Sequence, residues 1–290
     1  MENQNSLSRR TALKSSLFGF MAVSIPNILY AKEITKTAND KGLSDNIFHR
    51  YPSIDDGIVA EVVGTSHFNF DRVKELVNNR PELSRATWDW AFGDWETALG
   101  AASHVGRRDI AKFLMDNGAR PDIFTFAMFG RYEVVKAMIE STPGVETIGG
   151  PHGISLLRHA KAGLRNNYGI TLTEKQKNDS NELVDYLEKL GTADKQEENI
   201  EMTEEEKSKF LGDYKYAEGP NDGFSVKINM GKRLALGKLG KTGGSLYQKS
   251  SNVFTYNGTT SVEIRFLFEN DKVVSLTLVE PDLTLKAIKV

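Results

Sequence analysis

The sequence predicts an α + β protein of two domains, a helical solenoid followed by a small antiparallel β-sheet or barrel. Two observations predict it. Apolar residues recur at i, i+3 and i+4 between glycine-terminated segments over residues 57–194, whereas apolar and polar residues alternate over residues 210–290. A chain of 290 residues, 39% of them hydrophobic, is long enough for each domain to bury a core.

An export signal is the first element that we expect, over residues 1–31. The paired Arg9 and Arg10 precede an uncharged run that ends at Ala31, which is the order of a basic and an apolar region before a small residue at a cleavage site. The arginine pair resembles a bacterial twin-arginine signal. This resemblance implies a periplasmic or extracellular protein, and residues 32–56 are then an N-terminal extension.

Composition excludes several classes of function. The formal net charge is −2. Removal of the signal would take away three basic residues and one acidic residue, leaving 34 basic and 38 acidic residues and a net charge of −4. Nucleic-acid binding driven by bulk positive charge is therefore not expected. The absence of cysteine excludes disulfides, thiolate metal sites and cysteine nucleophiles. No stretch reaches the ~20 apolar residues that span a bilayer, so we expect no membrane span.

One segment carries a specific repeat motif. Thr97–Gly106 followed by Asp109–Ala119 resembles the ankyrin repeat, T-P-L-H-x-A-A-x-x-G and then x-I-V-x-x-L-L-x-x-G-A. Three weaker copies surround it, which gives four degenerate repeats over residues 57–194, with an insertion at 164–179 between the helices of the fourth. The resemblance implies an ankyrin-type stack of helix pairs that binds another protein.

A charged linker joins the two predicted domains. Residues 192–209 carry seven acidic and three basic residues and few apolar ones. Thr203 and Glu206 have the spacing of a capping box, which predicts one short helix at the end of this linker.

The alternating pattern predicts seven or eight short antiparallel strands over residues 210–290. Val262, Ile264 and Phe266 alternate with polar residues in one strand, and the hairpin turn Tyr256–Thr259 precedes it. The opening Phe210–Tyr214 resembles a β-domain appended to serine-β-lactamase-like hydrolases. No Ser-x-x-Lys and no Gly-x-Ser-x-Gly occurs in the chain, so the resemblance implies a fold and no chemistry.

A relaxed phosphate-loop pattern occurs at Ala235–Thr242. A genuine phosphate loop joins a strand to a helix, whereas the residues after Thr242 continue as a β-type run. We therefore predict a basic, glycine-rich turn between strands and no cofactor.

The densest unusual cluster contains all three tryptophans of the chain. It comprises Trp88, Asp89, Trp90, Asp94 and Trp95. Aromatic rings interleaved with carboxylates bind a cation, a sugar ring or a peptide side chain. The alternative is that the rings pack a loop onto the helices. We take this cluster as the best candidate binding site.

Histidines and arginines add further candidates. The ankyrin resemblance implies a concave binding face that includes Trp95, His104, Arg107 and Arg131. His152 and His159 bracket the start of the fourth repeat and are candidates for a shared binding role. The chain has five histidines: His49, His67, His104, His152 and His159. None has the local spacing of a metal site, so we predict no metal.

The leading hypothesis is an exported, non-enzymatic ankyrin-repeat protein that binds another protein. The alternative is a hydrolase or carbohydrate-active enzyme that uses Asp89 and Asp94 with His104 or His152. A third reading is an inert envelope component whose two domains pack together. The oligomeric state and the identity of the partner stay open.

Overall fold

The computed structural model describes residues 50–166 and 169–290. The chain divides into two units between Val59 and Ala60, and every helix and strand of the described residues except the start of α4 (Asp56–Thr65) belongs to the second unit. The predicted export signal and most of the predicted N-terminal extension lie outside the described residues.

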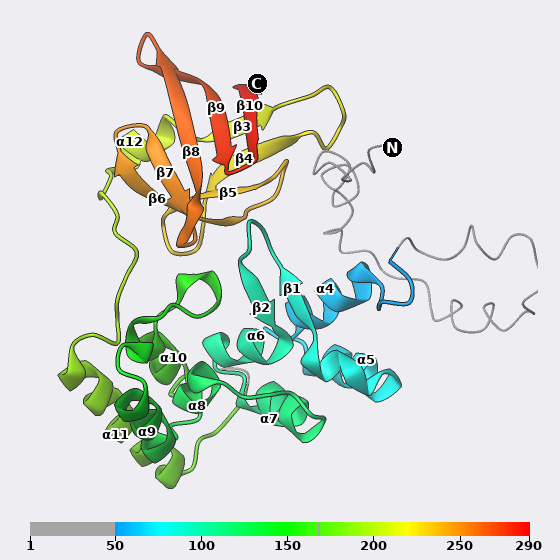
Figure 1. Cartoon of the computed structure of the whole chain (residues 1–290), viewed down its shortest axis with the longest axis vertical. Coiled ribbons are helices and arrows are strands. Elements are labelled where there is room, and N and C mark those ends of the chain that lie inside the picture. The colour runs from blue at the N-terminus through cyan, green and yellow to red at the C-terminus, as the bar shows by residue number, and fades with distance from the viewer. Residues whose placement is uncertain (1–49, 167–168) are drawn as a thin grey trace, which may run out of the picture. The chain divides into compact units, whose positions relative to one another are not determined.

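The first part of the described chain is helical (Figure 1). Its helices are α4 (Asp56–Thr65), α5 (Phe70–Asn79), α6 (Ala98–Val105), α7 (Arg108–Asp116), α8 (Ile123–Met128), α9 (Tyr132–Ser141), α10 (Leu156–Ala162) and α11 (Glu174–Leu190). Short 3-10 helices cover Pro81–Arg85, Val145–Thr147 and Pro151–Gly153. None of the helices in the described residues is long and apolar enough to cross a membrane.

The prediction of an ankyrin-type solenoid is wrong. The described residues contain nine short α-helices, from five to 17 residues long, and no repeat is evident among them. The signals that suggested a repeat are local ones: an apolar stripe, a threonine N-cap and a glycine C-cap occur in any helical hairpin. They specify individual helices and do not specify how successive helices stack.

Those local signals do describe the helix pair α6 and α7. Thr97 caps α6 by accepting a hydrogen bond from the Gly100 backbone N–H at 2.8 Å. Gly106 ends α6 in the left-handed region, at φ 82°, and a Cβ there would lie 2.2 Å from the carbonyl oxygen of Ala162. Only glycine therefore fits at this turn, which directly follows the helix that carries His104.

Helix α11 begins earlier than predicted. It starts at Glu174, inside the segment 164–179 that we expected to be an insertion. Thr173 and Gln176 form a capping box at its first turn. The assignment of residues 164–179 to an insertion overlooked this signal for a helix start.

The tryptophan cluster lies in a β-hairpin. Strand β1 (Thr87–Asp89) pairs antiparallel with β2 (Trp95–Thr97), and β2 runs directly into α6. Residues 90–94 form the tip of this hairpin.

The predicted C-terminal antiparallel β-domain is present, and its strands close into a barrel. The short helix α12 (Glu204–Ser208) precedes it, with the predicted capping box at Thr203. The strands are β3 (Gly212–Lys215), β4 (Gly223–Ile228), β5 (Leu234–Lys238), β6 (Gly244–Ser250), β7 (Val253–Tyr256), β8 (Thr259–Glu269), β9 (Lys272–Glu280) and β10 (Leu283–Lys289). Each strand pairs with the next, and β10 pairs with β3, so this sheet has no free edge.

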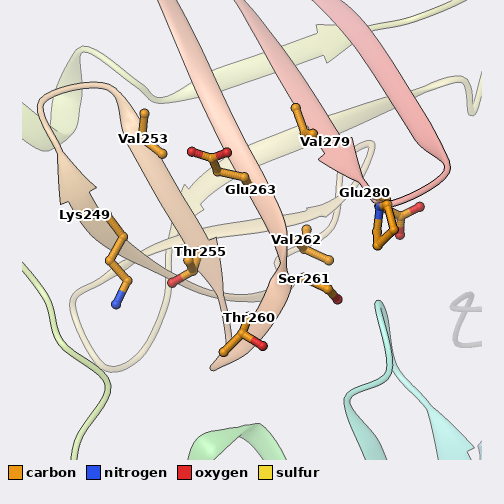
Figure 2. Close-up of a pocket in the computed structure, with 10 residues that line it drawn as sticks. Lys249, Val253, Thr255, Thr260, Ser261, Val262, Glu263, Val279 and Glu280 are labelled. Carbon is orange, nitrogen blue, oxygen red and sulfur yellow. The ribbon is translucent and has the colours of Figure 1, made fainter.

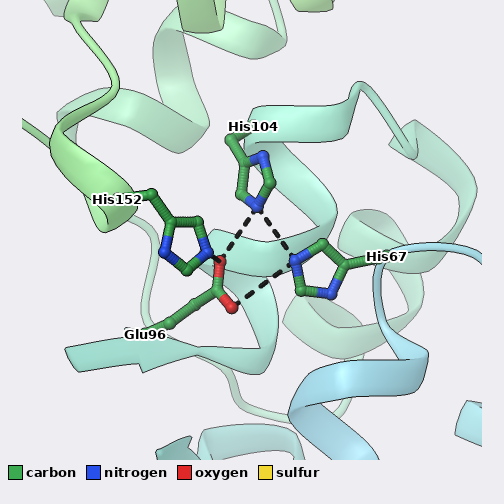
Figure 3. A group of neighbouring side chains, drawn as sticks. All are labelled: His67, Glu96, His104 and His152. Carbon is green, nitrogen blue, oxygen red and sulfur yellow. Dashed lines mark hydrogen bonds and ion pairs between the residues drawn. The ribbon is translucent and has the colours of Figure 1, made fainter. Parts of the chain in front are cut away.

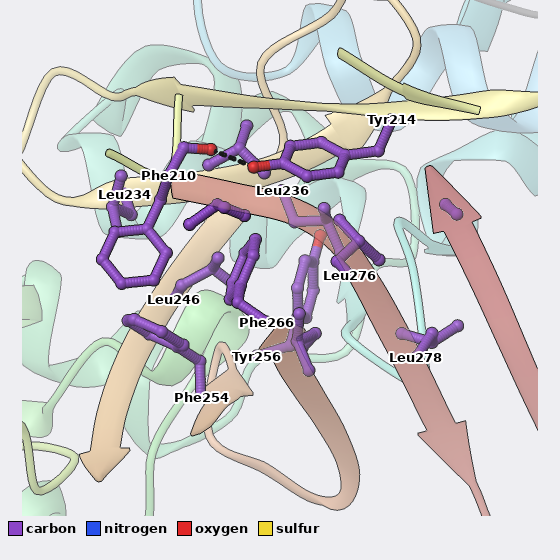
Figure 4. Close-up of a cluster of buried hydrophobic side chains, with 14 of the residues drawn as sticks. Phe210, Tyr214, Leu234, Leu236, Leu246, Phe254, Tyr256, Phe266, Leu276 and Leu278 are labelled. Carbon is purple, nitrogen blue, oxygen red and sulfur yellow. Dashed lines mark hydrogen bonds between the residues drawn. The ribbon is translucent and has the colours of Figure 1, made fainter. Parts of the chain in front are cut away.

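The barrel interior is filled by side chains (Figure 4). Along β8, Val262, Ile264 and Phe266 are buried, as their alternation predicted. The Tyr214 hydroxyl donates a hydrogen bond to the Phe210 carbonyl oxygen at 2.6 Å, which satisfies a polar group inside this apolar core. The predicted glycine-rich turn lies between β5 and β6, so no helix follows the phosphate-loop pattern.

Candidate metal centre

Four side chains from separate segments converge on one point (Figure 3). His67 lies in the turn between α4 and α5, Glu96 in β2, His104 in the last turn of α6, and His152 in the 3-10 helix Pro151–Gly153. One ligand atom from each residue lies within 4.8 Å of the others, and the group has the composition of a metal site. Three imidazoles and one carboxylate form this histidine–glutamate cluster.

The alternation of β2 explains why Glu96 points inward. Successive side chains of a strand face opposite sides, and here Glu96 is 1% exposed whereas its neighbour Trp95 is 63% exposed. A carboxylate buried to this degree is costly unless it is paired or coordinates a metal.

Two of the three imidazoles have a defined tautomer. His67 Nδ1 lies 2.9 Å from the Gly64 carbonyl oxygen, and His152 Nδ1 lies 2.7 Å from Asp94 Oδ2. Both oxygens can only accept, so each Nδ1 carries a proton, and each ring in its neutral form presents a lone pair at Nε2. An outer hydrogen bond of this kind is what orients histidines that ligate metals.

One carboxylate oxygen of Glu96 accepts a hydrogen bond, and the other does not. Trp90 Nε1 donates a hydrogen bond to Glu96 Oε2 at 2.7 Å. The other oxygen, Oε1, is buried and has no hydrogen-bond partner. His104 Nε2 and His152 Nε2 approach it at 3.0 and 3.4 Å, but neither contact has the geometry of a hydrogen bond. The lone pairs of this oxygen are therefore available to a cation.

The separations among the ligand atoms are short enough for one ion to contact all four residues. Metal–nitrogen and metal–oxygen bonds of about 2.0–2.1 Å give a tetrahedral edge of about 3.3 Å. The separation between His67 Nε2 and His104 Nε2 is 3.0 Å, and that between His67 Nε2 and Glu96 Oε2 is 3.5 Å. His104 Nε2 and His152 Nε2 lie 3.0 and 3.4 Å from the other carboxylate oxygen, Oε1. These four separations are close to that edge, and one ligand atom from each of the four residues lies within 4.8 Å of the others.

Charges within the cluster shift pKa values in opposite directions. Burial alone raises the pKa of Glu96, but the surrounding imidazoles outweigh it and hold that pKa well below its usual range. Burial alone lowers the pKa of His152, but the hydrogen bond to Asp94 and the negative charges of Glu96 and Asp94 raise it to about 10. Burial lowers the pKa of His104. Protonated His152 thus supplies a positive charge beside the buried carboxylate, and a divalent cation bound by the neutral imidazoles would take the place of that proton.

The donor set favours a transition metal. Imidazole ligands suit zinc, copper, iron and nickel, whereas calcium and magnesium take oxygen ligands. Three imidazole nitrogens and one carboxylate oxygen are a four-ligand donor set that suits Zn²⁺.

The structure brings four of the predicted site residues to this centre. His104 and His152 belong to the cluster itself. Trp90 hydrogen-bonds Glu96, and Asp94 hydrogen-bonds His152. Two members of the predicted tryptophan site and two of the predicted histidines are therefore parts of one arrangement.

The other hairpin candidates contribute no ligand atom to the cluster. Trp88 is half-buried and is paired in register with Glu96, and Trp95 is exposed on the opposite face of β2. Burial raises the pKa of Asp89, whose carboxylate accepts a hydrogen bond from the Gly93 N–H at 3.0 Å.

Arg107, Arg131 and His159 are not part of the cluster. Arg107 is buried and donates to both carboxylate oxygens of Asp109. Arg131 is exposed and precedes α9. His159 is buried in α10, where its Nδ1 contacts the Ser155 carbonyl oxygen at 2.9 Å, and burial lowers its pKa to about 4.

Sequence reasoning missed His67 and Glu96. Our prediction of no metal site considered only ligands close together in the sequence, and it did not anticipate a group built from four segments. The sequence offered only a weak signal for Glu96. It is the middle residue of a three-residue strand, so its side chain faces away from those of the exposed Trp95 and Thr97.

The cavities of the barrel are separate from this centre. One cavity of about 320 Å³ lies over β7–β9 and shares no lining residue with the histidine–glutamate cluster (Figure 2). Its Lys249 is paired with Glu197 at 2.9 Å and its Glu263 with Arg265 at 2.6 Å, so these charges are already satisfied.

Comparisons with known proteins give no family. No family model matches the sequence, and no curated protein is significantly similar to it.

Proposed function

We propose that the protein binds a divalent transition-metal ion, with Zn²⁺ as the best-fitting ion, at His67, Glu96, His104 and His152. The observation that carries this proposal is the buried Glu96 Oε1, which has no hydrogen-bond partner although two imidazole nitrogens face it within 3.4 Å. A bound cation satisfies this oxygen and the lone pairs of the imidazoles together.

The ion has a structural consequence. Its ligands come from the α4–α5 turn, the β1–β2 hairpin, α6 and the 3-10 helix before α10, so one ion cross-links four segments. Metal-binding free energy of this kind contributes to folding free energy, because the unfolded chain has no preformed site. In a chain without cysteine, the ion takes the cross-linking role that a disulfide has elsewhere.

This proposal keeps the predicted ligand-binding function, with a metal ion as the ligand. Binding of a protein partner, export, and hydrolysis at this centre stay predictions. Of the acids named for hydrolysis, Asp94 belongs to the arrangement, whereas Asp89 lies apart from it.

Zinc is expected to stabilise the metal-stripped protein against heat. At a free Zn²⁺ concentration 100 times the Kd, the stabilisation is about 2.7 kcal/mol. This corresponds to a rise in Tm of roughly 5–10 °C for a protein of this size. Thermal unfolding of the chelator-treated protein measures the shift. Calcium at the same concentration is the control and is expected to leave the Tm unchanged. An equal shift with calcium, or none with zinc, would contradict the proposed function.

A further inference from the structure

The barrel reaches the metal centre through one turn. Asn257 lies in the β7–β8 turn in the left-handed region, at φ 42°. Its side-chain Oδ1 accepts a hydrogen bond from the Ser245 N–H at 2.7 Å, and its backbone N–H donates to the Ser245 carbonyl oxygen at 2.9 Å. Because Oδ1 faces a donor, the orientation of the amide is fixed and Nδ2 must point the other way.

Asn257 Nδ2 points at the carboxylate that orients His152. It donates to Asp94 Oδ2 at 2.8 Å, and the same oxygen accepts from His152 Nδ1 at 2.7 Å. Asp94 Oδ1 accepts from the His152 backbone N–H at 2.9 Å. A continuous chain of hydrogen bonds thus runs from the barrel backbone at Ser245 to a ligand imidazole.

Packing at the same turn restricts its movement. The rings of Phe92, at the tip of the β1–β2 hairpin, and Tyr256 meet edge to face with centroids 4.9 Å apart. The Tyr256 hydroxyl accepts a hydrogen bond from the Gly244 N–H at 2.9 Å. Any Cβ at Gly244 would lie within 2.6 Å of Tyr256 and Asn257, so glycine is required for this close approach.

We infer that Asn257 is a positioning residue of the metal centre, so that the β-barrel completes the site built on the helical segments. Asn257 contacts no ion itself. It fixes Asp94, and Asp94 fixes the tautomer and orientation of His152. This inference rests on the proposed function and assigns the barrel a part in it.

Replacing Asn257 with glycine tests the inference. Glycine tolerates the left-handed turn and removes only the amide. Loss of an outer hydrogen-bond partner of a metal site costs 10–100-fold in affinity, and we expect about tenfold for this more remote residue. The matched control is Asn270→Gly. Asn270 is also left-handed, at φ 49°, in the turn at the opposite end of β8, and its replacement is expected to leave the Kd within about twofold.

The probe is Co²⁺ bound to the metal-stripped 290-residue chain, because its visible spectrum reports ligand geometry. Asn257→Gly is expected to shift or weaken the d–d bands, and Asn270→Gly is expected to leave them unchanged. Asn257→Ser, whose shorter side chain cannot bridge Ser245 and Asp94, is the second variant and is expected to behave as Asn257→Gly does. A spectrum and Kd equal to those of wild type in both Asn257 variants would overturn the inference.

A double-mutant cycle tests whether Asn257 acts through Asp94. In the Asp94→Ala background, which removes the shared acceptor oxygen, Asn257→Gly is expected to weaken Co²⁺ binding no further. The same tenfold loss in both backgrounds would show that Asn257 acts independently, and would overturn the inference. If the wild-type chain binds neither Co²⁺ nor Zn²⁺, the proposed function is overturned, and the inference with it. If wild type binds Co²⁺ and the Asn257 variants bind it equally well, only the inference is overturned.

Discussion

Glu96→Gln is expected to weaken Zn²⁺ binding at least about 100-fold, since even the loss of an outer hydrogen-bond partner of a metal site costs 10–100-fold. Glutamine keeps the size of the side chain and an oxygen that Trp90 can reach. It removes the negative charge that the structure buries to 1% exposure among three imidazoles. Competition with a chromophoric chelator measures the Kd of the wild-type and variant chains.

The matched control for this experiment is Glu61→Gln. Glu61 is partly buried in α4 and forms an ion pair with Arg72 at 2.7 Å, outside the histidine–glutamate cluster. Its replacement makes the same chemical change and is expected to leave the zinc Kd within about twofold, because charges in partly exposed pairs act weakly at a distance. Equal affinities for wild type and Glu96→Gln would exclude Glu96 as a ligand.

Phe266→Ala is expected to lower the free energy of unfolding by about 3–5 kcal/mol. Phe266 is 1% exposed, and its ring lies 4.9 Å from that of Phe210 and 5.4 Å from that of Phe254. Truncation removes the centre of the aromatic core of the barrel and leaves a cavity that its neighbours cannot fill. Denaturant unfolding followed by circular dichroism measures the change.

Leu267→Ala is the control from the adjacent position. Leu267 follows Phe266 in β8, faces the other side of the sheet and is 46% exposed. Its truncation is expected to cost less than about 1 kcal/mol, in keeping with a surface position. Equal losses for the two variants would contradict the assignment of the inner and outer faces of β8.

Local features of the fold could be predicted because a few neighbouring residues encode them. The capping box at Thr203 and the alternation Val262–Phe266 each act within one helix or strand. The ankyrin-type solenoid was predicted wrongly because it depends on how whole helices pack. An apolar stripe indicates which face of a helix is buried, but it does not indicate which other helix packs against that face. The antiparallel β-domain could be predicted because alternation and hairpin turns restrict the connections between strands.

The site was predicted only in part. His104 and His152 were candidates as histidines, and Trp90 and Asp94 as members of an unusual cluster. Their common role depends on Glu96, which no motif distinguishes, and on His67, which the fold brings from another segment. Metal ligands distant in sequence leave no spacing pattern to detect. The tryptophans also do not share one role. Trp90 donates a hydrogen bond to Glu96, a proposed metal ligand, whereas Trp95 is exposed.

X-ray absorption at the zinc edge tests the central claim most directly, on the purified chain after zinc loading and dialysis. We expect one zinc ion per chain, with three imidazole nitrogens and one carboxylate oxygen at about 2.0–2.2 Å. A spectrum of six water-like oxygens, or a chain that retains no zinc, would contradict the assignment of His67, Glu96, His104 and His152 as a metal centre.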